Sequence, residues 1–284
     1  MVWKIRKVIK TMPKLKDPIL IEGLPGIGNV GKVAVDFMID ELGAVKIMEF
    51  SSYSLPHSVF VNEDNLVELP RIELYYKKAS DLKNHGLKKL SKQLSKKLSK
   101  KNKKLLLPRR DFLFLSGDIQ PTDEEASYDF SNTILNVFSQ FKGKELITIG
   151  GIGLSEIPEK PKVFCTGTAK NTVKNFIHDT PASSKLYGVV GPIVGVTGLL
   201  VGLAQKRNMN AVCLLAETYA HPLYLGIKGS QEVLKILNKK LSLNLDLKSL
   251  NTEIKEVEQE IMKRTEQLQN VTKKESSGQV SYIG

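Results

Sequence analysis

The sequence predicts an α/β protein built on a mixed sheet. Strand-length apolar runs alternate with amphipathic helical segments through most of residues 14–240. The chain has 284 residues, of which 41% are hydrophobic and 25% are charged, a balance that supports a sizeable buried core. We therefore expect an α/β core domain over residues 1–240.

The first elements read as an edge strand followed by a β-α-β unit. Apolar residues at positions 2–9 alternate loosely with lysines, which suits an edge strand. From Pro18, a buried strand leads into a glycine turn and then into a helix whose apolar residues recur every three or four positions until Gly43. A second strand over Val45–Phe50 follows at once. This order predicts that the two strands pair side by side and in parallel.

The next elements are a β-meander and a capped helix. Alternating runs at 58–61, 65–69, 71–76 and 111–115 predict the meander, in which Tyr76 leads into Phe112 across a hairpin interrupted by a basic insertion. Thr122 and Glu125 form a capping box, with the threonine as N-cap, that opens a helix reaching about Phe141. Further buried strands are expected at 145–149, 162–165 and 211–215, and further helices near 169–177, 195–205 and 231–238.

The net charge of +12 is concentrated in the insertion at residues 77–110. That segment holds 14 Lys or Arg and a single acid, while the rest of the chain has 28 basic and 29 acidic residues. Its leucines at 87, 90, 94 and 98 predict a basic amphipathic helix. The helix is either a solvated insertion or a contact for a membrane surface, RNA or an acidic protein. It has no aromatic residue for base stacking and no arginine before Arg109, so we expect no DNA partner.

The chain changes character near residue 241. Apolar residues occupy heptad a and d positions with Arg264 as the one lapse, which predicts a coiled-coil-like helix over 241–272; these residues are Leu247, Leu250, Ile254, Val257, Ile261, Leu268 and Val271. Residues 273–284 then form a polar, flexible tail that ends in the apolar tip Val280 to Gly284.

The sharpest ligand signal is the Gly26–Gly31 turn, which matches G-x-G-x-x-G between a strand and a helix. Glu49, at the end of the next strand, stands where a ribose-binding acid would lie. The alternative is that the glycines only form a tight turn and a close contact between helix and strand. Val33 replaces the Ser or Thr of a P-loop, which disfavours phosphoryl transfer.

Other candidate chemistry is weaker. Glu217 ends a buried strand, where its carboxylate either binds a ligand or serves as a helix cap or an oligomer contact. The four histidines lack metal-ligand spacing, and no serine lies in a nucleophile elbow. We therefore expect no metal and no catalytic residue. Cys165 and Cys213 lie in apolar runs, which suits a reduced, cytoplasmic chain. The uncharged run at 188–204 is short and broken by glycines, so we expect a buried helix there instead of a membrane span.

Five blocks in a fixed order resemble the archaeal branch of the proteasome assembly chaperone family. They are Glu22 to Ala34, Pro56-His57-Ser58, Leu115 to Pro121, the glycine run from Gly191 to Gly202, and Ala216-Glu217-Thr218. The resemblance implies a three-layer α/β sandwich with a mixed sheet, similar to the nucleoside-phosphorylase fold. It also implies a homo-oligomer with no catalysis and no cofactor, in which the glycine turn is structural.

The resemblance gives the C-terminal tip a role as well. Family members end in a hydrophobic-tyrosine-any residue motif that enters pockets between α subunits of the proteasome core particle. Here the expected docking residues are Val280, Tyr282, Ile283 and Gly284, with the tyrosine third from the end instead of second. The implied function is an ATP-independent chaperone or adaptor that binds the proteasome α ring. The alternative is a nucleotide- or nucleoside-binding enzyme that uses the Gly26–Gly31 turn.

Overall fold

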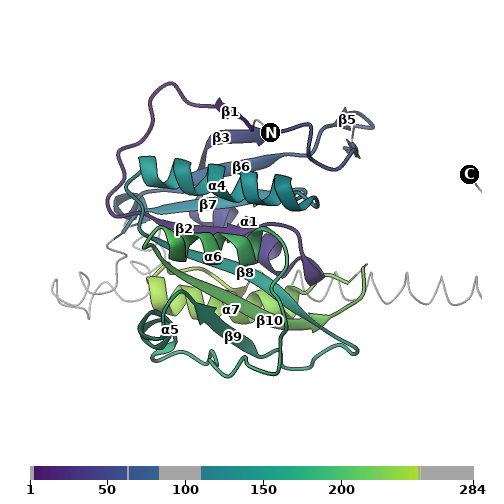
Figure 1. The fold of residues 1–284 in the computed structure, drawn as a ribbon, viewed down its shortest axis with the longest axis vertical. Coiled ribbons are helices and arrows are strands. Elements are labelled where there is room, and N and C mark those ends of the chain that lie inside the picture. Colours follow the sequence, from purple (N-terminus) through teal and green to yellow (C-terminus); the bar gives the residue numbers. More distant parts are fainter. Residues whose placement is uncertain (1–2, 63, 83–109, 223, 249, 251–284) are drawn as a thin grey trace, which may run out of the picture.

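The computed structural model describes residues 3–62, 64–82, 110–222, 224–248 and 250 (Figure 1). Its centre is one eight-stranded sheet with the strand order β1-β3-β6-β7-β2-β8-β10-β9. These strands are β1 (Lys4–Lys7), β2 (Ile19–Gly23), β3 (Val45–Ser51), β6 (Ile72–Lys77), β7 (Phe112–Gly117), β8 (Glu145–Leu154), β9 (Val163–Gly167) and β10 (Asn210–Tyr219). The main helices are α1 (Val30–Leu42), α4 (Glu124–Gln140), α5 (Lys170–Ile177), α6 (Val196–Lys206) and α7 (Ile227–Leu241).

The sheet is mixed, as predicted. Strands β7, β2, β8 and β10 are neighbours and run parallel. Antiparallel pairs extend this parallel centre on both sides, through β6, β3 and β1 on one side and through β9 on the other. The central strands are buried on both faces, which explains why they are continuous apolar runs in the sequence.

Helices cover both faces of the sheet and create two apolar cores. On one face, α1, α5 and α7 pack against alternate residues of β2, β7, β8 and β10. On the other, α4 and α6 pack against the intervening residues and against β3 and β6. The three-layer α/β sandwich of the expected fold class is therefore confirmed. Within the described ranges, no helix combines the length and apolar character needed to cross a membrane.

The predicted side-by-side pairing of the first two core strands is wrong. Strands β2 and β3 run in the same direction, but β7 and β6 lie between them. The β6–β7 hairpin, predicted from Tyr76 and Phe112, occupies this space: Tyr76 pairs with Leu113, and Lys77 pairs with Phe112. A β-α-β pattern in a sequence indicates strand direction, and it does not exclude strands that enter later in the chain.

Two smaller expectations are also corrected. The first two runs of the predicted meander form a separate two-stranded sheet of β4 (Phe60–Val61) and β5 (Val67–Glu68). The N-cap of α4 is Asp123 instead of Thr122: its carboxylate accepts a 2.9 Å hydrogen bond from the Ala126 amide. Aspartate and threonine are both good N-caps, so the sequence alone does not separate neighbouring positions.

Asp111 joins the chain segments at the base of the basic insertion. Its carboxylate is buried and accepts hydrogen bonds from the backbone amides of Lys16 at 2.6 Å and Ala79 at 2.8 Å. Leu82, the last described residue before the gap at 83–109, is buried in the same core as α1. The point where the chain leaves the sheet is therefore fixed to the point where it returns.

Residues 83–109 and 251–284 lie outside the described residues, so the insertion at 77–110, the helix at 241–272 and the tail at 273–284 stay predictions. Helix α7 ends at Leu241, close to the expected end of the core domain. The chain then continues along the body, where Leu243, Leu245 and Leu250 are buried in the same core as α1 and α7. The first heptad positions, Leu247 and Leu250, therefore pack against the body.

Candidate functional site

The glycine turn lies at the carboxyl ends of the parallel strands, where α/β proteins often bind ligands. Its backbone packs closely on the neighbouring strands. A Cβ atom added to Gly31 would lie 2.4 Å from the Ile149 carbonyl oxygen of β8. Gly28 has a φ of 61°, and an added Cβ would lie 2.6 Å from the Thr218 hydroxyl of β10. The glycines of the motif therefore form a tight turn with close contact between helix and strand.

A cavity of about 60 Å³ remains between this turn and the start of α6. Gln120 closes one side: its amide nitrogen donates to the Pro25 carbonyl at 2.5 Å, and its oxygen accepts from the Val196 amide at 3.1 Å. Pockets for small-molecule ligands have volumes of roughly 300 to 1,000 Å³. The cavity is thus of a size for water and is too small for a nucleotide.

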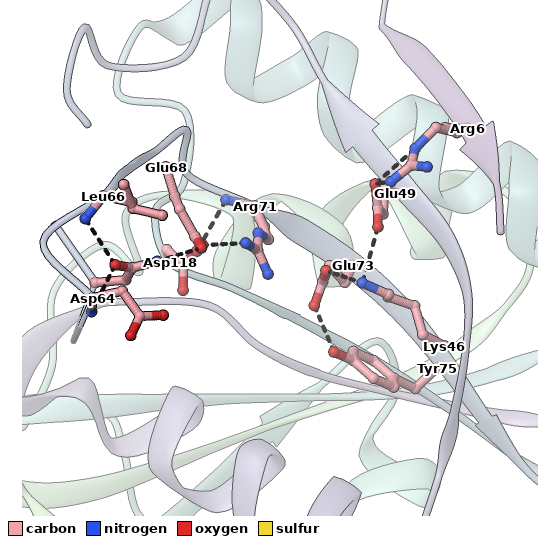
Figure 2. A network of polar contacts seen from close by, with 11 residues as sticks. Arg6, Lys46, Glu49, Asp64, Leu66, Glu68, Arg71, Glu73, Tyr75 and Asp118 are labelled. Carbon is pink, nitrogen blue, oxygen red and sulfur yellow. Dashed lines mark hydrogen bonds and ion pairs between the residues drawn. The ribbon is translucent and has the colours of Figure 1, made fainter. Parts of the chain in front are cut away.

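Glu49 is too distant to complete a dinucleotide site. It lies on β3, three strand spacings from β2, or ~14 Å at the usual separation of sheet strands. Its carboxylate pairs with Arg6 and, at 2.9 Å, with Lys46, which also pairs with Glu73 (Figure 2). The hydrogen bond from Lys46 is the largest cause that lowers the pKa of Glu49. Glu49 is therefore part of a polar network on the sheet face of β1, β3 and β6.

Glu22 is a buried acid that the sequence reasoning did not select as a site. Its side chain, at the end of β2, is fully buried. One carboxylate oxygen accepts hydrogen bonds from the Leu24 amide at 3.0 Å and from the Thr197 hydroxyl of α6 at 3.3 Å. The other oxygen has no partner in the described part of the chain. Burial raises the pKa of Glu22 to about 7, against the effect of these hydrogen bonds. The feature of the sequence that could have identified Glu22 is that it is the single acid in an otherwise apolar strand.

The other candidate residues, Glu217, the histidines and the cysteines, are in contact with neighbouring groups of the fold. The Glu217 carboxylate accepts a 2.8 Å hydrogen bond from the Lys162 amide, which extends the β10–β9 pairing; this contact within the sheet is neither the helix cap nor the oligomer contact that its structural alternative predicted. His178 pairs with Asp179, and His221 stacks on Tyr219. Over the described ranges, no group of three His, Cys, Asp or Glu side chains could hold a metal ion. Both cysteines are buried and form no disulfide, and burial raises the pKa of each thiol to about 12.

Two exposed apolar surfaces are present that the sequence reasoning missed. The first, which we call the hairpin patch, surrounds β4 and β5, with side chains 44 to 74% exposed at Val59, Phe60, Val61, Leu66, Val67 and Leu69. The second, the loop patch, combines the loop before α6 with the glycine turn through Tyr187, Val189, Val194 and Ile27. Val194 and Ile27 line the same small cavity. The alternating pattern at 58–69 predicted strands but did not show that both strand faces would be uncovered.

The expected docking residues Val280, Tyr282, Ile283 and Gly284 lie outside the described residues. The structure therefore does not test the tail, and it stays a prediction. Of the candidate acids, Glu49 lies away from the glycine turn and pairs with Lys46, and the Glu217 carboxylate is held by the Lys162 amide.

Several known proteins are similar to this chain over most of its length. The solved structure of PbaB from Pyrococcus furiosus, described as an archaeal proteasome activator, is 30% identical, with a TM-score of 0.75 over 93% of this chain and 98% of that one. PbaA from the same organism, described as an archaeal homolog of proteasome-assembly chaperone, has the same fold: it is 20% identical, with a TM-score of 0.66 over 96% of each chain. An uncharacterized protein of Methanocaldococcus jannaschii is 25% identical over 77% of this chain and 72% of its own.

A family model also matches this chain. The model described as "PAC2 family" matches residues 20–265, which is most of the chain. The predicted resemblance is confirmed, and the chain belongs to the PAC2 family.

Proposed function

We propose that this protein is a non-enzymatic, ATP-independent proteasome assembly chaperone or adaptor. It acts in the cytoplasm as a homo-oligomer and binds the α ring of the proteasome core particle through its C-terminal tails. The observation that carries this proposal is the 30% identity to PbaB, an archaeal proteasome activator, over nearly the whole of both chains. The filled glycine turn and its water-sized cavity support a body without a nucleotide site.

The tail mechanism is physically reasonable only for several chains acting together. One tip of five residues buries little surface, so a single tail binds weakly. Tails carried by one oligomer raise one another's effective concentration, and avidity can increase affinity by ~10²- to 10⁴-fold. The polar segment of about seven residues before the tip spans at most ~25 Å, so the body must lie close to the ring. Capture of a C-terminal carboxylate is a known mode of peptide recognition.

A pull-down tests this mechanism directly. Full-length protein is expected to capture archaeal core particle or isolated α subunits, whereas a chain that ends at Ser281 captures neither. Tyr282→Ala is expected to behave like the truncated chain, and Ser281→Ala serves as its matched control and retains binding. Equal capture by the truncated and full-length chains would contradict docking through the tail. Peptidase activity of the core particle, measured with and without the protein, then separates an activator from an assembly factor.

The nucleotide-binding alternative has a separate test. A ligand present at 100 times its Kd stabilises the folded state by about 2.7 kcal/mol. Thermal-shift measurements with NAD, ATP and nucleosides are therefore expected to leave the melting temperature unchanged.

The Lys-rich insertion is proposed as an accessory contact to an acidic protein surface. A contact through the insertion is electrostatic and weakens as salt is raised. Deletion of residues 83–104 should remove this salt dependence, and the binding to the core particle that remains at high salt is then the tail contact.

A further inference from the structure

Glu22 joins two segments that border the small cavity. Its Oε1 atom accepts hydrogen bonds from the Leu24 amide, just before the glycine turn, and from the Thr197 hydroxyl in the first turn of α6. Leu24 and Thr197 both line the cavity between the turn and the start of α6. One buried carboxyl group therefore connects the end of β2 to the first turn of α6, the helix that lies over the sheet in Figure 1.

The strands beside Glu22 place no charge next to it. Its neighbours in the sheet are Leu115 on β7 and Thr148 on β8, and Cys213 follows on β10. Paired residues of adjacent strands point to the same face of a sheet, so these side chains form one row beneath α6. The Cys213 thiol is the titratable group of this row, and burial keeps it neutral by raising its pKa to about 12.

The turn and the helices around Glu22 also supply no cation. Residues 23–31 are uncharged, α6 has no charged residue before Lys206, and the buried side chains of α4 are not titratable. Lys32 belongs to α1, on the other face of the sheet, and it pairs with Asp36 and Asp118. An ionised Glu22 is therefore a buried charge without a counter-ion in the described part of the chain.

The ionised form of Glu22 needs water. Glu22 Oε2 and Thr148 Oγ1 are buried and have no hydrogen-bond partner in the part of the chain that the structure describes. The hydrogen bonds from Leu24 and Thr197 favour the ionised form, yet burial outweighs them and raises the pKa of Glu22 to about 7. The adjacent cavity of about 60 Å³ exceeds the ~10 to 15 Å³ that one water molecule requires. An opening that hydrates the carboxylate from this cavity therefore favours the loss of its proton.

The segment best placed to open is the start of α6 with the loop before it. Two hydrogen bonds from other segments hold the helix start: the Val196 amide donates to Gln120, and the Thr197 hydroxyl donates to Glu22. The loop carries the most exposed side chains of the loop patch, because Tyr187 is fully exposed and Val194 is 83% exposed. Exposed segments with few buried contacts open at a lower free energy than core strands.

We propose that the protonation state of Glu22 controls the start of α6 and the loop at 186–195. With the carboxyl group protonated, the helix start stays closed on the glycine turn. Loss of the proton draws water into the cavity and releases the helix start together with the loop. The inference goes beyond the proposed function and involves neither the tail nor the proteasome. It makes the presentation of the loop patch depend on pH, with the loop held at acidic pH and released at alkaline pH.

Hydrogen exchange of the full-length chain, followed by mass spectrometry on peptides within 186–196, tests this control. Glu22→Gln cannot ionise, and these peptides are identical in both chains, so the ratio of wild-type to variant exchange rates removes the chemical effect of pH. A hydrated Glu22 regains the ordinary pKa of 4.5 in place of about 7, so the ratio is expected to rise by up to about 30-fold between pH 5.5 and pH 8.5. Glu217→Gln, the same change at the end of β10, is the matched control and should follow the wild type. A ratio that does not change with pH would overturn the proposal.

Peptides of α5 distinguish a local opening from unfolding of the whole chain. This helix lies on the other face of the sheet, so its ratio is expected to stay constant, and an equal rise in α5 would contradict release of the loop alone. The test does not use the proteasome, so its failure is distinguishable from failure of docking.

Thr197 provides a second test that does not depend on the folding of Glu22→Gln. Thr197→Val removes the hydroxyl and is expected to speed exchange within 186–196 by roughly 2- to 10-fold at pH 5.5, whereas Thr197→Ser retains the wild-type rate. Equal rates for the valine and serine variants would overturn the role of this contact. Circular dichroism at both pH values confirms that each variant folds.

Discussion

Replacement of Glu22 by glutamine gives the most quantitative test of the core described above. Glutamine retains a carbonyl oxygen that can accept from the Leu24 amide and the Thr197 hydroxyl, but it cannot ionise. The comparison of wild type and Glu22→Gln therefore isolates the free energy of placing a charge at the end of β2.

The magnitude follows from the pKa of Glu22, which rises from 4.5 to about 7 on folding. The folded state holds the proton more tightly than the unfolded chain, so protonation stabilises the fold. This stabilisation is fully present below pH 4.5 and is lost as the pH rises through about 7. The two pKa values correspond to about 3 kcal/mol of unfolding free energy. Glu22→Gln should lack this pH dependence.

Urea unfolding between pH 5 and pH 8 measures the effect. Trp3 is the single tryptophan; it is buried with its ring centroid 4.5 Å from that of Phe130, which makes its fluorescence a probe of the folded state. The unfolding free energy of wild type minus that of Glu22→Gln is expected to fall by about 2 to 3 kcal/mol over this range. Thr197→Val removes a hydrogen bond that favours the charged form, so the loss should extend to higher pH. A difference that does not change with pH would refute the reasoning.

Two further substitutions test the packing around the sheet. Asp111→Ala leaves the part-buried amide of Lys16 and the buried amide of Ala79 without their acceptor, so it is expected to lower the unfolding free energy by about 2 to 4 kcal/mol. Asp111→Asn should recover part of this loss, and chemical denaturation that finds no loss for the alanine variant would contradict the role of Asp111. Gly28→Ala introduces a Cβ atom at a positive φ and against the Thr218 hydroxyl, which is expected to lower the unfolding free energy by roughly 1 to 3 kcal/mol. Gly26→Ala is its control, because no atom lies within 4 Å of the added carbon. Equal melting temperatures for the two glycine variants would show that the turn is not closely packed.

The elements of this fold could be predicted from local sequence, whereas their neighbours in the sheet could not. Buried strands such as β2 and β7 are continuous apolar runs, and the end of α1 is marked by Gly43. Strand order depends on contacts between distant segments, and here a hairpin from later in the chain separates β3 from β2. The same limit applies to Glu22, because the hydroxyl that bonds it comes from Thr197, 175 residues away.

The candidate site shows a similar division. The glycine motif was recognised together with its structural alternative, but only the three-dimensional structure shows how closely Gly28 and Gly31 pack on the neighbouring strands. Exposure is the property that sequence patterns report least well. Residues 58–69 have the alternation of a half-buried strand, yet β4 and β5 lie outside the main sheet and remain uncovered.

The two ends of the basic insertion are held together by the β6–β7 pairing and by Asp111, so the insertion can be shortened or replaced. Lys77 already pairs with Phe112, and Asp111 already holds Ala79, so the β6–β7 hairpin does not depend on the segment at 83–109 for its register. Closing a shorter loop costs less entropy, by about 0.6 kcal/mol for each halving of its length. The segment can therefore be replaced by a brief linker, or by a reporter domain with neighbouring ends, without a change in the sheet.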